Sequence, residues 1–227
     1  MSKVLFVKAN DRGEQAVSVK LYDAFLESYK RNHPEDEVVE LDLFKEDLPY
    51  LNANMINGSF KAARGIELTP EEREAVAVKH KYLDQFLAAD KVVFGFPLWN
   101  LTIPAVLHTY IDYIYEAGKT FKYTEQGPVG LIPDKKIALL NARGGIYSDG
   151  PAAAAEMSFN YIRNIMAFFG VTQFENIIVE GHNQLPHKAE ELISEGVEKA
   201  DKAAFIVSHT VARPPLPLFL MIWAEGE

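Results

Sequence analysis

Short apolar runs alternate with longer stretches of helical spacing along the 227-residue chain. The apolar runs are typical of strands that are buried on both faces of a sheet. They predict strands over residues 3–8, 37–41, 91–96, 136–141 and 174–180. Between them, apolar residues recur every three or four positions, as in amphipathic helices. This spacing predicts helices over residues 15–30, 69–89, 104–117, 152–169 and 186–207.

Five strands that alternate with five helices predict a parallel sheet, because parallel strands are joined by right-handed helical crossovers. We therefore predict an α/β fold: a flavodoxin-like, doubly wound, five-stranded parallel sheet of order 2-1-3-4-5, with helices on both faces. One domain is expected over residues 1–208, and residues 209–227 form a C-terminal extension whose role the sequence leaves open. Prolines in this extension favour a polyproline II conformation.

Two segments interrupt the alternation of strands and helices. Residues 44–68 are too long for an ordinary connection, and such segments are often lids, binding loops or partner contacts. A surface excursion that only covers the sheet edge is the alternative. Residues 120–130 are rich in aromatic and turn-forming residues, and they predict a small hairpin.

The composition excludes several classes of function. A net charge of −9 without a basic cluster argues against nucleic acid as a partner. The absence of cysteine excludes disulfides, thiolate metal sites and thiol catalysis. His182, His187 and Glu180 lack further ligands nearby, so no metal site is predicted. The strand pattern begins at Lys3 without a secretory leader, and we expect a cytoplasmic protein with no membrane partner.

Ligands of open parallel sheets bind beyond the carboxyl ends of the strands, where the strand order reverses. Three loops are expected to meet there. Residues 9–18 lead into a helix start, whose free amides and dipole suit a phosphate, although the G-x-G-x-x-G fingerprint and the P-loop lysine are missing. Residues 96–100, F-P-L-W-N, place Trp99 at this edge. Residues 141–147 carry paired glycines that permit close approach of a ligand, and an arginine that suits an anion.

A flat, phosphorylated cofactor suits three such loops, and FMN matches the architecture best. Other interpretations remain for the single residues: Trp99 as an aromatic that covers the core, and Arg143 as a surface residue of a plain turn. A serine hydrolase is disfavoured because no G-x-S-x-G occurs. A phosphoacceptor domain is disfavoured because Phe96 and Pro97 stand where its aspartate would be.

The chain resembles the bacterial family of FMN-dependent NADH-azoreductases and NAD(P)H:quinone oxidoreductases, of the Bacillus azoreductase type, over residues 1–208. The similar segments are K-V-L-F-V-K in the first strand, F-P-L-W-N at 96–100, T-F-K-Y-T-E-Q-G-P-V-G-L at 120–131 and N-A-R-G-G-I-Y-S-D-G-P at 141–151. The resemblance implies that the FMN phosphate is held by Asn10, Ala16, Val17 and Ser18. It implies that the isoalloxazine ring is held by Leu98, Trp99, Asn100, Leu101, Ala142, Arg143, Gly144 and Gly145. The family often has more hydroxyl residues in the first loop, so here backbone amides are expected to carry more of the phosphate contact.

The resemblance predicts a homodimer that binds FMN tightly but non-covalently and reduces quinones and aromatic azo compounds in two-electron, ping-pong steps. Azo bonds would be cleaved to amines, with NADH or NADPH as the electron donor. Lys61 and Arg64 either meet the 2′-phosphate of NADPH or are solvated surface charges. No catalytic side chain is required, because the flavin carries the chemistry.

An aromatic box for planar substrates is expected from Trp99, Phe60 and Tyr123, with the active site near the dimer interface. The alternative for Tyr123 is a packing residue of the hairpin. For the whole protein, the alternatives are a flavodoxin-like electron carrier and a general NAD(P)H:flavin reductase. The length of the chain and its two inserted segments favour the quinone and azo reductase.

Overall fold

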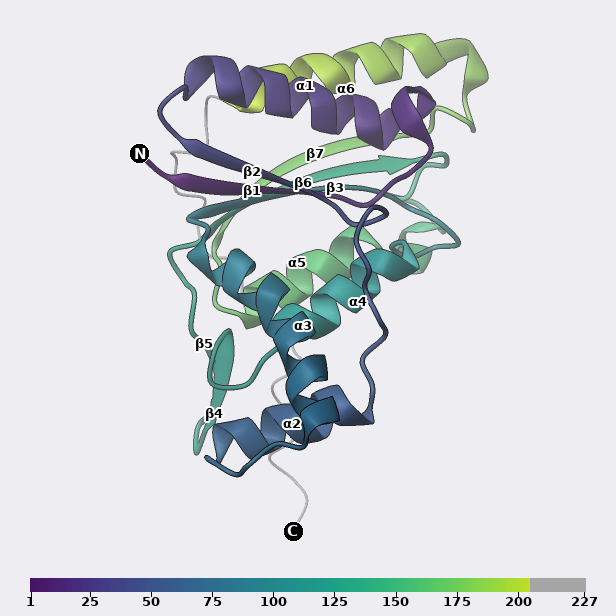
Figure 1. Ribbon diagram of the computed structural model, residues 1–227. Helices are drawn as coiled ribbons and strands as arrows, with labels where there is room; N and C mark the ends of the chain where they lie inside the picture. The colour runs from purple at the N-terminus through teal and green to yellow at the C-terminus, as the bar shows by residue number, and fades with distance from the viewer. Residues whose placement is uncertain (205–227) are drawn as a thin grey trace.

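Five parallel strands form one sheet between two layers of helices in the computed structural model, which describes residues 1–204 (Figure 1). The strands are β1 (Lys3–Lys8), β2 (Glu37–Asp42), β3 (Lys91–Pro97), β6 (Lys136–Arg143) and β7 (Gln173–Glu180). Their order is β2-β1-β3-β6-β7, and every neighbouring pair is parallel. Counted within the sheet, this is the predicted order 2-1-3-4-5.

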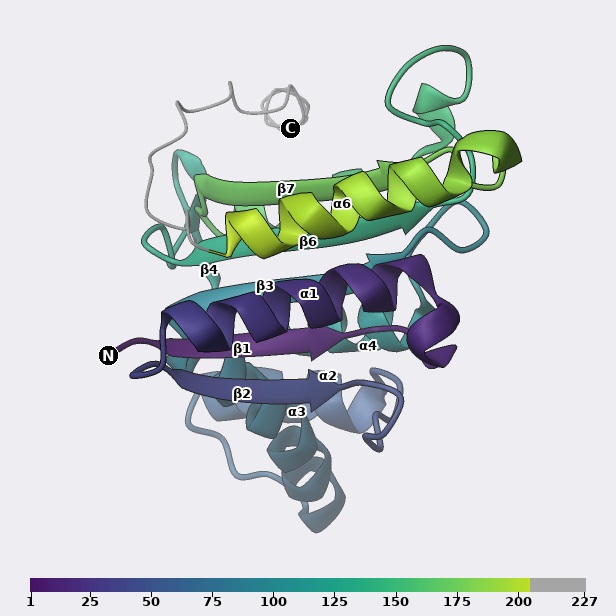
Figure 2. The same cartoon turned by 90° about the horizontal axis from the view of Figure 1, so that it is seen from above.

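The helices cover both faces of the sheet, as predicted. One layer consists of α1 (Val17–Asn32) and α6 (Ala189–Ala203), which lie side by side in Figure 2. The opposite layer consists of α3 (Pro70–Ala88), α4 (Ala105–Ile114) and α5 (Phe159–Phe168). The start of α3 is fixed by a capping box, in which Thr69 Oγ1 accepts from the Glu72 amide and Glu72 Oε2 accepts from the Thr69 amide.

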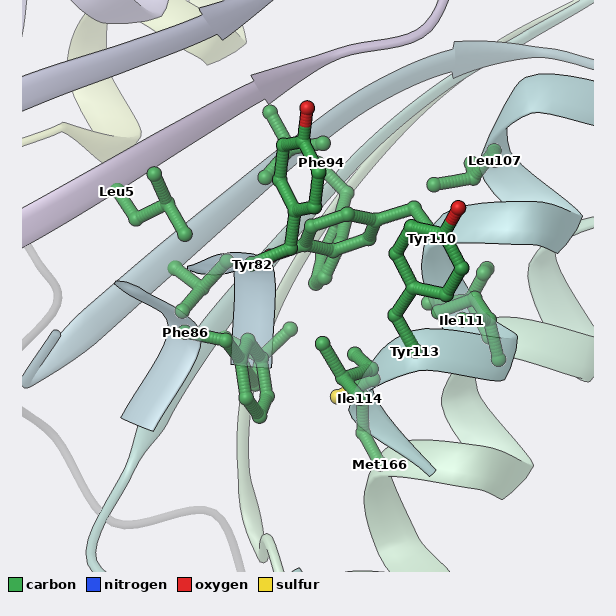
Figure 3. Packing of buried hydrophobic residues seen from close by; sticks show 14 of the residues in the cluster. Leu5, Tyr82, Phe86, Phe94, Leu107, Tyr110, Ile111, Tyr113, Ile114 and Met166 are labelled. Carbon is green, nitrogen blue, oxygen red and sulfur yellow. The ribbon is translucent and has the colours of Figure 1, made fainter. Parts of the chain in front are cut away.

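An apolar core lies on each face of the sheet. The larger core, beneath α3, α4 and α5, is dominated by fully buried aromatic rings (Figure 3). Tyr82 and Tyr113 stack with centroids 5.7 Å apart, and Tyr110 meets Phe94 edge-on. Each such ring contributes on the order of 2 kcal/mol through removal of its surface from water. These buried layers fix the strand ends and therefore the loops that leave them.

The two inserted segments form regular structure. Residues 44–68 contain a helix, α2 (Ala53–Ala63), so the prediction of a long loop was wrong for its central part. The sequence pattern hid this helix because its asparagine, glycine and serine are weak helix formers. It is stabilised by packing: a Cβ on Gly58 would lie 2.6 Å from Val76 Cγ2 of α3. The predicted hairpin is confirmed as β4 (Phe121–Thr124) paired with β5 (Gly127–Gly130).

Two helices begin three or more residues later than predicted. The helix expected from residue 152 begins at Phe159, because residues 153–155 form a separate 3-10 turn and the Glu156 carboxylate binds the first amides of α5. The helix expected from residue 186 begins at Ala189, also after a 3-10 turn. Residues 205–207 of that prediction, and the predicted extension 209–227, lie outside the described residues.

Candidate functional site

The loops that follow β1, β3 and β6 leave the same edge of the sheet. These three strands are direct neighbours, and the strand order reverses between β1 and β3. Hydrogen bonds continue the strand pairing into the loops: the Ala9 amide donates to Gly95 at 2.9 Å, and the Leu98 amide donates to Ala142 at 2.8 Å. The predicted convergence of three loops at one site is therefore confirmed.

The first loop ends at the uncapped start of α1. Asn10 and Ser18, predicted phosphate ligands, are both buried and bind each other, with Nδ2 2.9 Å from Oγ. Ala16 stands at the N-cap with an extended backbone and offers no side-chain cap. Within residues 1–204, the amides of Val17 and Ser18 donate to no acceptor. Free amides at the positive end of a helix dipole are suited to a phosphate.

The second loop is a tight turn between Trp99 and Thr102. The Trp99 amide donates to the Thr102 carbonyl at 2.9 Å, and the Thr102 amide returns the bond at 3.0 Å. Between them, Asn100 and Leu101 adopt positive φ values of 50° and 70°. A backbone of this kind is uncommon outside glycine and occurs often at ligand sites. The amides of Asn100 and Leu101 have no acceptor in the described part of the chain, so both are available as donors.

The side chain of Trp99 is partly exposed beside this turn. Its ring lies edge-on to Phe44, with centroids 6.3 Å apart, and Phe44 is itself 36% exposed. The indole therefore contacts a surface aromatic from the segment after β2. This position is compatible with a wall of a ligand site.

Arg143 is buried, which the sequence did not reveal. Its side chain is 3% exposed, and its Nε donates to Asn141 Oδ1 at 2.6 Å. Nη1 lies 3.4 Å from Glu180 Oε2, and Nη2 lies 3.9 Å from Glu156 Oε1. The interpretation of Arg143 as a surface residue was wrong, and two protein carboxylates already compensate its charge. Sequence reasoning missed these partners because neither spacing nor motif connects them to Arg143.

The carboxylate of Glu156 stays ionised in this buried position. Burial alone would raise its pKa. The opposing effects are stronger, and they come from hydrogen bonds donated by Ser158, Phe159 and Asn160 and from the charge of Arg143. The pKa of Glu156 is consequently lowered. Arginine and glutamate are thus both charged beneath the third loop.

The paired glycines of the third loop pack against the segment after β7. A Cβ on Gly144 would lie 2.5 Å from Asn183 Nδ2. The Asn183 amide also donates to the Gly144 carbonyl at 2.9 Å. Close packing therefore favours glycine at this position whether or not a ligand approaches it, since a larger residue would displace the Asn183 side chain. Among the described residues, the amides of Gly144 and Gly145 have no acceptor, so both glycines can still donate to a ligand.

Among residues 1–204, no ring contact joins Trp99 to the other two members of the predicted aromatic box. Phe60 on α2 and Tyr123 on β4 are 61% and 71% exposed. Figure 1 shows α2 and the β4–β5 hairpin at the end of the molecule farthest from α1 and α6. Lys61, a candidate for the 2′-phosphate of NADPH, instead donates to both carboxylate oxygens of Glu72 at 2.7 Å.

The site fits FMN by the chemistry of its donors. Three pairs of backbone amides in these loops have no acceptor among residues 1–204: Val17 and Ser18, Asn100 and Leu101, and Gly144 and Gly145. FMN offers a phosphate and ring carbonyls that accept such bonds. In residues 1–204, no group of three or more acidic or histidine side chains is arranged for a metal ion, and no helix is long and apolar enough to span a membrane.

An open α/β sheet with ligand loops at its switch point defines a flavodoxin-like protein, and the family model described as flavodoxin-like fold matches residues 2–204. The chain belongs, within that class, to the family of bacterial FMN-dependent NADH:quinone oxidoreductases and azoreductases. It is 71% identical over 205 residues to FMN-dependent NADH:quinone oxidoreductase 4 of Bacillus cereus. It is 58% identical to FMN-dependent NADH:quinone oxidoreductase 1 of Bacillus subtilis. Each match covers 90% of this chain and 99% of the relative.

Solved structures that resemble this chain also belong to the azoreductases. The azoreductase of Bacillus anthracis is 69% identical, with a TM-score of 0.89 and coverage of 91% of this chain and 100% of that chain. A second protein of Bacillus anthracis, an FMN-dependent NADH-azoreductase solved in complex with FMN, is 30% identical with a TM-score of 0.84. That match covers 92% of this chain and 100% of the other.

Proposed function

We propose that this protein is an FMN-dependent, NADH-using reductase of quinones and aromatic azo compounds. The observation that carries the proposal is the 71% identity to a relative named FMN-dependent NADH:quinone oxidoreductase 4. The match covers 99% of the length of that relative. The amide donors at the carboxyl edge of the sheet support it independently, because they suit FMN. Azoreductases among the similar structures support the azo substrates.

The three loops are expected to bind different parts of FMN. The free amides of α1, braced by the Asn10–Ser18 pair, would hold the phosphate. The turn at residues 98–101 and the loop at residues 142–145 would hold the ring, and the bond from Leu98 to Ala142 fixes these two segments to each other. When bound, FMN would supply the two-electron redox chemistry that connects NADH with the acceptor in ping-pong order. The protein contributes orientation and exclusion of water.

The proposal includes a homodimer, which the exposure of two predicted substrate-binding aromatics supports. Within one chain, Phe60 and Tyr123 are exposed, and neither ring contacts Trp99 among residues 1–204. A second copy would bring such aromatic side chains to the site and complete a box for planar acceptors. Sedimentation of the purified protein tests this, since a monomer at all concentrations would exclude a box shared between two chains.

Three further properties belong to the proposal. NADH is favoured over NADPH because Lys61 is already paired with Glu72. Residues 1–208 form the FMN-binding domain, so a chain ending at Ser208 should still bind FMN. The protein is cytoplasmic, in keeping with a chain that has no cysteine; cell fractionation checks this.

The test is spectroscopic. Purified protein loaded with FMN should keep its flavin absorption through gel filtration, lose it under anaerobic NADH and regain it on addition of a quinone. An azo dye should be decolorised with release of amines. Free FMN without protein is the control. A protein that binds no FMN would overturn the proposal.

The two alternative functions give different results in the same assay. An electron carrier would lose its absorption with a donor but would turn over neither quinone nor dye. A general flavin reductase would release FMN on the column and reduce it as a free substrate.

A further inference from the structure

We propose that Glu156 is a positioning residue for the flavin site, a role that rests on the proposed function. Glu156 lies near the end of the connection from β6 to α5, outside the residues of that connection that were predicted to hold the flavin. Its side chain is 2% exposed and lies at the start of α5, one residue before Met157. Glu156 binds the first turn of α5 and forms an ion pair with Arg143, which precedes the third loop. The residue after Glu156 is hydrogen-bonded to the Trp99–Thr102 turn of the second loop.

Glu156 organises the first turn of α5 with both carboxylate oxygens. Oε1 accepts from the Ser158 amide at 2.9 Å, the Ser158 hydroxyl at 2.6 Å and the Phe159 amide at 2.8 Å. Oε2 accepts from the Asn160 amide at 3.0 Å. These amides would otherwise lack partners, as at any helix start. The carboxylate therefore fixes the position of α5 relative to the segment that precedes it.

Glu156 also holds the residue on which the third loop begins. Arg143 is the last residue of β6, directly before Gly144, and its guanidinium lies 3.9 Å from Glu156 Oε1 and 5.5 Å from the centre of the Phe159 ring. Asn141 joins the same cluster, since its Nδ2 reaches Ser158 Oγ at 3.4 Å. The side chain of Arg143 is thus enclosed from the α5 side by groups that Glu156 places.

The neighbours of Glu156 hold the second loop. The Met157 amide donates to the Leu101 carbonyl at 2.9 Å, and Thr102 Oγ1 lies 3.4 Å from the Met157 carbonyl. Leu101 is one of the two residues with a positive φ. A single buried carboxylate therefore supports both segments that are expected to hold the ring.

The charges in this cluster predict a sign for its effect on the flavin. Arg143 contributes one positive charge, and Glu156 and Glu180 contribute two negative charges, so the cluster carries a net charge of −1. Reduction adds electrons to a bound flavin, and a nearby negative charge opposes this. Replacement of Glu156 by glutamine neutralises the cluster and should make the midpoint potential of bound FMN more positive.

The experiment compares Glu156→Gln with Asp36→Asn, a matched change at the opposite edge of the sheet. Asp36 likewise accepts from a backbone amide, that of Ser2, at 2.6 Å and pairs with a cation, Lys91, at 3.4 Å. FMN is titrated into both apo-proteins and the wild type by fluorescence quenching. For Glu156→Gln we expect the Kd for FMN to rise about tenfold, equivalent to about 1.4 kcal/mol. We also expect a more positive potential and an altered visible circular dichroism of the bound flavin. Asp36→Asn should change none of these.

A milder pair of variants keeps the test valid if Glu156→Gln does not fold. Ser158→Ala removes one donor to Glu156, and Ser28→Ala removes an equally buried hydroxyl that donates to the Asp201 carbonyl at 2.6 Å. Ser158→Ala should weaken FMN binding, whereas Ser28→Ala should not. A wild-type Kd and potential in Ser158→Ala, and in Glu156→Gln if that variant folds, would overturn the positioning role while leaving the proposed function intact. A wild-type protein that binds no FMN would overturn both.

Discussion

Trp99 and Thr102 exchange both backbone hydrogen bonds across a turn whose two central residues are not glycine. Asparagine tolerates the left-handed conformation, whereas leucine at φ 70° costs roughly 1 kcal/mol. The turn keeps this conformation because the Leu101 carbonyl accepts from Met157 and Thr102 Oγ1 lies 3.2 Å from His108 Nε2. The conformation of this turn is therefore fixed by contacts within the protein.

Leu101→Val should destabilise the protein by about 1 to 2 kcal/mol, because a β-branched residue is poorly tolerated at positive φ. Leu101→Gly should leave the free energy of unfolding nearly unchanged, although it removes more apolar surface. Urea denaturation of the two variants measures the difference. Equal losses would mean that the side chain, and not the backbone conformation, determines stability here.

Trp99→Ala should raise the KM for a quinone about fivefold, the equivalent of an aromatic contact of about 1 kcal/mol, with little loss of stability. The matched variant is Phe44→Ala, which removes the ring that Trp99 contacts. Steady-state kinetics and FMN titration give the two constants. Unchanged FMN affinity and unchanged acceptor turnover in Trp99→Ala would return this residue to a covering role.

Tyr110→Phe should be neutral or should stabilise the protein by up to about 1 kcal/mol, because its buried hydroxyl has no partner in residues 1–204. Tyr113→Phe, on the same helix, should cost about 1 kcal/mol, since that hydroxyl donates to the Pro49 carbonyl. Both side chains are fully buried. Thermal and urea unfolding should rank the variants in this order, and the reverse order would contradict the assignment.

Gly196→Ala should lower the free energy of unfolding by about 1 to 3 kcal/mol, because the added Cβ overpacks the contact between α6 and the sheet. That Cβ would lie 2.0 Å from Val179 Cγ2 of β7. Val179→Ala creates space, so the double variant should lose less than the sum of the two single variants. Strict additivity in a double-mutant cycle would show that the two residues do not compete for the same volume.

Asp36 should make stability depend on acid pH. Burial alone would raise its pKa, but hydrogen bonds from Tyr29 and the Ser2 amide and the charge of Lys91 lower it to about 2. Because the folded pKa is below the ordinary 3.8, the stabilisation is complete above 3.8 and is lost as the pH falls through 2. In urea denaturation, wild type and Asp36→Asn should therefore converge as the pH falls through this window. A constant difference between them would contradict the role of the carboxylate.

The sheet and its loops were predictable because their signals are local. Strands such as β3 are buried on both faces and read as unbroken apolar runs, and the reversal of strand order then fixes which loops meet. The hairpin was predictable from its turn residues. Helix α2 was not, because its stability comes from the contact of Gly58 with Val76 and not from its own composition.

The hydrogen-bond and ion-pair partners of the buried site residues could not be predicted from the sequence. Asn10 and Ser18 were recognised as candidates, but their mutual hydrogen bond depends on how the first loop folds back onto α1. Arg143 was also recognised, yet its burial between Glu156 and Glu180 requires α5 and β7 to be in place. Such long-range ion pairs leave no periodicity or fixed spacing that sequence reasoning can detect.

Helix α5 connects the Glu156 carboxylate at its first turn to the β4–β5 hairpin beyond its last turn. Its first turn is bound by the Glu156 carboxylate. Just past its other end, the backbone of Gly170 meets Gly130 of the hairpin so closely that a Cβ on Gly130 would lie 2.1 Å from the Gly170 nitrogen. The ten residues between span about 15 Å. The helix is therefore a spacer of fixed length, and one inserted residue would shift the hairpin by about 1.5 Å and turn it by about 100° relative to the site.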